Sequence, residues 1–107
     1  MDEEFSQLPA ESSRFDGPGF FVLDEPESAL SFSAQLALLS HLMAVTADGR
    51  SQVILSTHSP VLASLPGARV RELGEWGYRE TAWEELELVD HYRRFLAGPE
   101  RYLRYLQ

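Results

Sequence analysis

Two short apolar runs, separated by about the length of one helix, constrain the fold of this 107-residue chain more than any other feature. The first run covers residues 20–23 and the second covers residues 53–55, and each passes directly into polar residues. Because successive side chains of a strand point to opposite faces, uninterrupted apolar runs indicate strands that are buried on both faces of a parallel sheet. We therefore expect an α/β fold with a parallel βαβ core and flanking helices.

The stretch between these runs predicts a single helix. Ser31 is a residue type that accepts hydrogen bonds from the free N–H groups of a first turn, so we expect it to be the N-cap. The helix should run to about Ala47, and residues 48–50 should end it. Helical spacing assigns its buried stripe to four apolar residues, namely Phe32, Leu36, Leu39 and Met43.

Two smaller elements are predicted after the second strand. Ser59 and Pro60 are the residue types favoured at the start of a helix, and they predict a short one. Residues 69–81 predict a small hairpin in which residues 74–77 form a four-residue loop.

The C-terminal residues predict a further amphipathic helix. Thr81 and Glu84 have the spacing of a capping box that would open it. Gly98 should end this helix, and Pro99 should start a last short one. One side of the main helix should carry its apolar residues, which are Leu86, Val89, Tyr92 and Leu96.

Length and composition limit the class of protein. A chain of this size fits one domain, which we place at residues 17–107 after a loose or partly helical lead-in at residues 1–16. The net charge of -8 disfavours nucleic acid as a partner. No apolar run approaches the ~18 residues that span a bilayer, and the absence of cysteine fits a cytoplasmic location.

Candidate chemistry lies where the two predicted strands end. Asp24 and Glu25 follow the first strand, and His58 follows the second. Ligands of open α/β sheets collect at the carboxyl ends of the strands. A magnesium-binding carboxylate, a water-orienting carboxylate and a histidine facing phosphate are the parts that phosphoanhydride hydrolysis needs.

These segments resemble known ATPase motifs. Residues 20–26 look like the Walker B motif of ABC-type ATPases, in the branch labelled AAA-type ATP-binding proteins, which are P-loop NTPases. Residues 27–31 resemble the D-loop, and residues 56–60 resemble the histidine switch loop. The resemblance runs over residues 17–107, which correspond to the C-terminal half of such an ATPase domain.

The resemblance implies a role for each matching residue. Asp24 would hold Mg²⁺ that arrives with ATP, Glu25 would orient or deprotonate the attacking water, and His58 would contact the γ-phosphate. Ser31 departs from the family pattern, which usually has aspartate at the end of the D-loop. The residues that would face a partner subunit are Ser28, Ala29, Leu30 and Ser31.

The phosphate-binding half of the site has no counterpart in this sequence. A P-loop requires Gly-x-x-x-x-Gly-Lys followed by serine or threonine, and all nine basic residues here are arginine. No signature motif is present, and the chain begins about where that motif would end. We therefore expect a truncated ATPase half that binds ATP weakly and is inactive alone. A P-loop half, or a dimer partner, would complete it. ATPases of the family that it resembles serve transport, DNA repair, phage defence and toxin systems, and the sequence favours none of these processes over the others.

Two other functions fit the same residues. The first is a non-enzymatic interaction module or remnant that docks on an intact ATPase or associates with itself. The second is a mononuclear metal hydrolase built on Asp24, Glu25 and His58.

Overall fold

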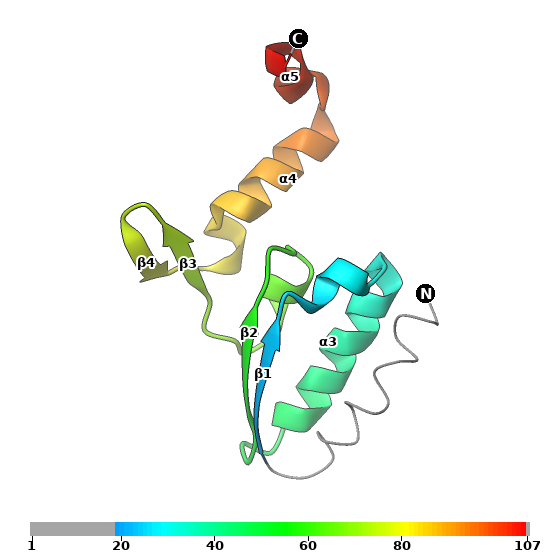
Figure 1. The fold of residues 1–107 in the computed structure, drawn as a ribbon, viewed down its shortest axis with the longest axis vertical. Coiled ribbons are helices and arrows are strands. Elements are labelled where there is room, and N and C mark those ends of the chain that lie inside the picture. Colours follow the sequence, from blue (N-terminus) through cyan, green and yellow to red (C-terminus); the bar gives the residue numbers. More distant parts are fainter. Residues whose placement is uncertain (1–18, 107) are drawn as a thin grey trace. The chain divides into compact units, whose positions relative to one another are not determined.

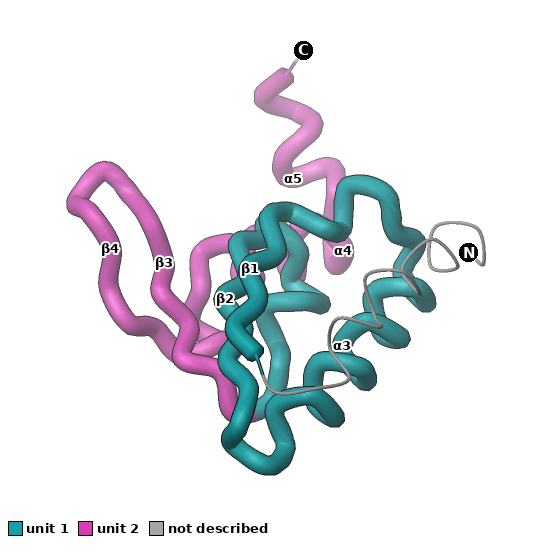
Figure 2. Tube along the Cα trace, turned by 60° about the horizontal axis from the view of Figure 1, so that its bottom comes forward, with its two compact units in different colours: residues 1–66 teal, residues 67–107 magenta. Residues whose placement is uncertain are grey.

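The computed structural model describes residues 19–106, so the predicted lead-in at residues 1–16 lies outside the described residues. The chain divides into two compact units, residues 1–66 and residues 67–107 (Figure 2).

The first unit contains the predicted parallel βαβ core. Strand β1 (Phe20–Asp24) leads through a short 3-10 helix, η2 (Pro26–Ala29), into helix α3 (Phe32–Thr46), which lies beside the strands in Figure 1. Strand β2 (Gln52–Ser56) then pairs with β1 in parallel, and a second 3-10 turn, η3 (Leu62–Ser64), follows. Asp24 is level with Ser56 in this register, so the segments that follow the two strands leave the sheet at the same edge.

The predicted N-cap of α3 is confirmed, but its predicted buried stripe is wrong. The Ser31 hydroxyl accepts a hydrogen bond from the Ala34 N–H at 3.2 Å. Leu39 is buried as expected, whereas Phe32, Leu36 and Met43 are exposed. The residues that α3 buries are Ala34, Leu38, Leu39 and Leu42. Apolar residues surround much of this helix, so their spacing alone does not determine which side meets the sheet.

The core of the first unit lies on one face of the sheet. Leu38, Leu39 and Leu42 pack against Leu62 of η3, and partly buried residues of both strands and the connecting loops surround them. Alternate residues of β1 and β2 point the other way, and Phe20, Val22 and Ile54 are 60%, 63% and 49% exposed. We call these three side chains the open sheet face. Both faces are apolar as predicted, but only one of them is well covered.

The second unit begins with the predicted hairpin, whose turn is tighter than expected. Strands β3 (Arg71–Gly74) and β4 (Gly77–Glu80) are antiparallel, and Gly74 pairs with Gly77. The loop therefore contains two residues instead of the predicted four. Gly77 has a φ of 101°, a conformation that side-chain-bearing residues rarely adopt, and this conformation closes the turn.

The last helices follow the hairpin, and their start differs from the prediction. A 3-10 turn, η4 (Trp83–Glu85), precedes α4 (Glu87–Ala97), so the predicted capping box does not form. The Thr81 hydroxyl donates to the Arg79 carbonyl, and the Glu87 N–H instead donates to the Glu72 carboxylate of the hairpin at 2.6 Å. The Glu72 carboxylate, fifteen residues away in the sequence, thus accepts a hydrogen bond at the start of α4, which is the role that the capping-box pattern assigned to Thr81.

The predicted end of α4 is confirmed, whereas its predicted apolar stripe is only partly buried. Gly98 is its C-cap, and α5 (Glu100–Leu103) and η5 (Arg104–Leu106) follow Pro99. Of the predicted stripe, Leu86 and Val89 at the start of the helix are buried, whereas Tyr92 and Leu96 further along it are exposed. No helix among residues 19–106 is both long and apolar enough to span a membrane.

Candidate functional site

Glu25 directly follows β1 and has a left-handed backbone conformation, with φ 47° and ψ 53°. Among the described residues it is the only non-glycine residue with a positive φ. Its N–H still donates to the Ser56 carbonyl at 2.7 Å, so the pairing of the two strands continues up to this residue. Because this conformation costs an L-residue roughly 1–2 kcal/mol, the fold holds Glu25 there against a local preference.

The turn at Glu25 brings two of the predicted catalytic residues together. The Oε1 atom of Glu25 lies 3.3 Å from Nδ1 of His58, which follows β2. Both groups are open to solvent, with side-chain exposures of 50% and 79%. A carboxylate and an imidazole that meet at the carboxyl edge of a parallel sheet can relay a proton or orient a water. The geometry joins them, and their roles in catalysis stay predictions.

Asp24 is separated from this pair by the alternation of the strand. Its side chain is exposed on the same face as Val22. Among the described residues its carboxylate has no hydrogen-bond or ion-pair partner. An exposed carboxylate at the end of a strand fits Mg²⁺, which keeps several waters and takes one or two protein carboxylates together with substrate phosphates.

Glu27 is a site residue that the sequence did not single out. Its Oε1 accepts a 2.7 Å hydrogen bond from the Thr57 hydroxyl, and its Oε2 accepts a 2.9 Å hydrogen bond from the His58 N–H. Partial burial raises the pKa of Glu27, but these hydrogen bonds outweigh burial and hold its pKa below the ordinary value. The sequence placed Glu27 only at the start of the D-loop-like segment, because no local pattern signals a contact with a residue thirty positions away.

A second set of hydrogen bonds, made by a residue of α3, holds the loop that carries His58. Ser59 is buried, and its hydroxyl donates to Oε1 of Gln35. The other end of that amide, Nε2, donates to the Leu30 carbonyl at 3.3 Å. The Ser59 hydroxyl also accepts from the N–H groups of Val61 and Leu62, so Ser59 holds the turn that leads into η3. The helix itself starts later than predicted, at Leu62 with Val61 as its N-cap.

The D-loop-like residues divide into two kinds of environment. Ser28 and Ala29 are exposed on η2. Leu30 packs against the core, and Ser31 caps α3. The first two residues are therefore the ones that this unit leaves accessible to a partner, while the other two serve the fold of the unit itself.

A mixed group of potential metal ligands also occurs here. Single ligand atoms of Glu25, Glu27 and His58 lie within 4.8 Å of one another. This set differs from the set of the metal-hydrolase alternative, which used Asp24 in place of Glu27. Both oxygens of Glu27 already accept hydrogen bonds, so its observed contacts are those of a residue that holds the loop.

Comparison with known protein families gives a match. Residues 6–64, more than half of the chain, match the family described as "AAA domain, putative AbiEii toxin, Type IV TA system". Neither the curated proteins nor the solved structures contain a match to the chain. The matched region contains Glu25, Glu27 and His58.

Proposed function

The chain belongs to this AAA-domain family of P-loop-type ATPases, and from that premise we propose that it is the C-terminal catalytic half of an ABC-type ATPase. In this proposal residues 20–26 are a Walker B motif, and the activity is the hydrolysis of Mg-ATP once a P-loop is supplied. The α/β core with its parallel strands is compatible with part of a P-loop NTPase fold.

The observation that carries the proposal is the 3.3 Å approach of the Glu25 carboxylate to the His58 imidazole. Glu25 orients the attacking water and accepts its proton, and His58 contacts the γ-phosphate. Asp24 would hold Mg²⁺, and the bound ion would supply positive charge for the phosphate oxygens. These roles divide the chemistry between two neighbouring strand ends.

The open sheet face supports the need for a second half. Parallel sheets are found almost only with both faces covered. Phe20, Val22 and Ile54 leave one face of β1 and β2 largely exposed. A complementary half would cover this face, and it would also bring the P-loop, which the lysine-free sequence does not contain.

Binding energies explain why this half should be inactive alone. Micromolar affinity for a nucleotide requires about -8 kcal/mol. Two or three charge-assisted contacts, at about 1.5–3 kcal/mol each, barely reach this value before an association cost of at least ~4 kcal/mol is subtracted. We expect millimolar binding of ATP at best without a P-loop.

Steady-state hydrolysis of Mg-ATP tests the proposal. The purified chain should turn over no ATP alone and should gain activity when a P-loop half of the same family is added. Glu25→Gln should abolish that activity, whereas Glu75→Gln, the same chemical change at the hairpin turn, should preserve it. Robust hydrolysis by the chain alone, or full activity of Glu25→Gln, would refute the proposal.

An interaction module without catalysis is the second candidate, and the open sheet face favours it. In that case Ile54→Asp, which places a charge on the face, should abolish binding to a P-loop half, and Glu25→Gln should change no measurable property of the complex. The catalytic proposal instead requires that both variants lose ATP turnover and that only Ile54→Asp loses binding.

A further inference from the structure

We propose that Glu27 is a positioning residue that fixes the backbone of His58 and ties it to the exposed residues Ser28 and Ala29. This inference rests on the proposed function, because it assigns a purpose to contacts around the proposed γ-phosphate sensor. It adds a residue that the resemblance to ATPases did not assign to catalysis.

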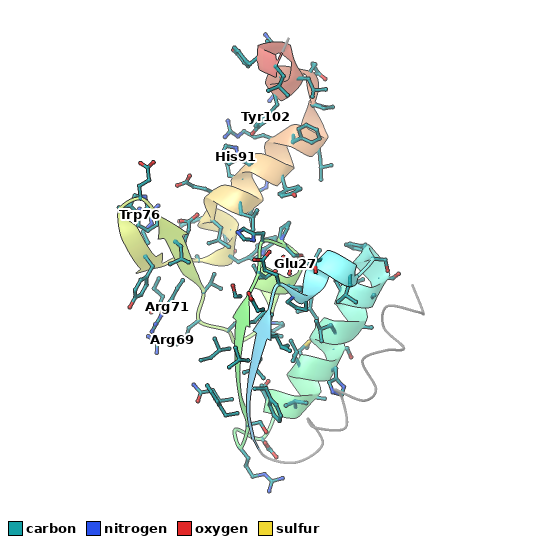
Figure 3. All side chains as sticks on the ribbon, viewed as in Figure 1. Glu27, Arg69, Arg71, Trp76, His91 and Tyr102 are labelled. Carbon is teal, nitrogen blue, oxygen red and sulfur yellow. The ribbon has the colours of Figure 1, made fainter. Side chains whose placement is uncertain are left out.

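The first step is the pair of hydrogen bonds that Glu27 accepts. One of its oxygens binds the Thr57 hydroxyl, and the other binds the His58 N–H (Figure 3 labels Glu27 beside the ends of β1 and β2). The Thr57 oxygen accepts in turn from the Ser59 N–H at 2.9 Å. Three consecutive residues of the loop are therefore held by one carboxylate, directly or through one hydroxyl.

The second step is that His58 needs such support. Its side chain is 79% exposed, so packing does not fix the imidazole. Within residues 19–106, the position of the ring then depends on the backbone that carries it and on the contact with Glu25. A carboxylate that accepts two hydrogen bonds is a strong restraint, because bonds to a charged acceptor are about twice as strong as neutral ones.

The third step links the loop to the segment that would meet a partner. Glu27 contacts the loop from one end of this segment, and Leu30 is joined to Ser59 through Gln35 at the other end. Ser28 and Ala29 lie between these two anchors and are exposed. A partner that displaces Ser28 and Ala29 must therefore disturb the hydrogen bonds of Glu27 and those of Gln35, and with them the backbone that carries His58.

Nuclear magnetic resonance of the isolated chain tests the inference without ATP or a P-loop half. Wild type should show a scalar coupling across the hydrogen bond between the amide nitrogen of His58 and the carboxyl carbon of Glu27. Glu27→Gln should speed hydrogen exchange of the His58 amide about tenfold, because a charge-assisted hydrogen bond becomes a neutral one. The amide of Leu42 in the core should exchange unchanged.

Variants at Thr57 separate positioning from general stability. Thr57→Val replaces the hydroxyl with a methyl group of similar size and should also speed exchange at His58, whereas Thr57→Ser keeps the hydroxyl and should retain wild-type exchange. Equal exchange at His58 in wild type, Glu27→Gln and Thr57→Val, or no coupling in wild type, would overturn the inference. Because no ATP turnover is measured, a negative result here is distinct from a failure of the Glu25→Gln test.

Discussion

The left-handed backbone of Glu25 predicts an unusual order of stability for two substitutions. Glu25→Gly and Glu25→Ala both remove the carboxylate that contacts His58, so the loss of that contact cancels when the two variants are compared. They differ only by one Cβ atom. At a φ of 47° this atom is strained, and glycine adopts the same conformation without penalty.

The magnitude follows from two opposing terms. Glycine relieves the roughly 1–2 kcal/mol that the left-handed conformation costs an L-residue. It loses ~0.5–1 kcal/mol because its unfolded chain is more flexible. The midpoints of the two terms leave Glu25→Gly more stable than Glu25→Ala by about 0.8 kcal/mol, or about 3–6 °C in melting temperature.

A matched pair in the middle of α3 gives the control. Ser40 is exposed and helical, so Ser40→Ala should be more stable than Ser40→Gly by about 1 kcal/mol. Urea unfolding followed by circular dichroism measures all four variants. If alanine is equal to or better than glycine at both positions, the left-handed conformation does not constrain Glu25, and the reasoning fails.

Three other predictions concern the same unit. Ser31→Ala should lower the free energy of unfolding by about 1 kcal/mol through loss of the α3 cap. Ser31→Asp keeps a capping oxygen and should retain most of that stabilisation in the same urea experiment. Leu42→Ala should cost about 2–5 kcal/mol by leaving a cavity in the core, whereas the partly exposed Leu36→Ala should cost clearly less; equal losses would contradict the observed orientation of the helix. The pKa of Glu27 is lower in the folded chain than its ordinary value of 4.5, so as the pH falls below 4.5 the unfolded chain takes up a proton before the folded chain does. The contribution of this carboxylate to the free energy of unfolding is therefore complete above pH 4.5 and is lost as the pH falls through the folded pKa. The stability difference between wild type and Glu27→Gln should therefore shrink on acidification below about 4.5, and a constant difference would show that Glu27 is not linked to folding.

Much of the fold could be predicted because its signals are local. The apolar run before Asp24 and the one before Ser56 became the paired strands, and Ser31 and Gly98 mark the helix ends that their chemistry favours. The hairpin was predicted, but its turn length was not, since pairing of Gly74 with Gly77 depends on the strand register.

The candidate site was only partly predictable. Glu25 and His58 could be named because each follows an apolar run, and the parallel pairing then sets the two strand ends side by side. Glu27 could not be identified, because its hydrogen bonds reach Thr57 and His58 across a helix and a strand. Distance along the chain removes such contacts from any local pattern.

The sequence by itself determined which segments form strands and helices, that Ser31 caps the start of α3 and Gly98 ends α4, and which ionisable groups stand at the strand ends, because these features depend on neighbouring residues. Tertiary structure alone decided that α3 buries Leu42 and leaves Met43 exposed, that Glu25 turns left-handed, and that Glu27 holds the loop of His58. The physical reason is that burial, backbone strain and long-range hydrogen bonds belong to the packed arrangement of the elements, which no single segment encodes.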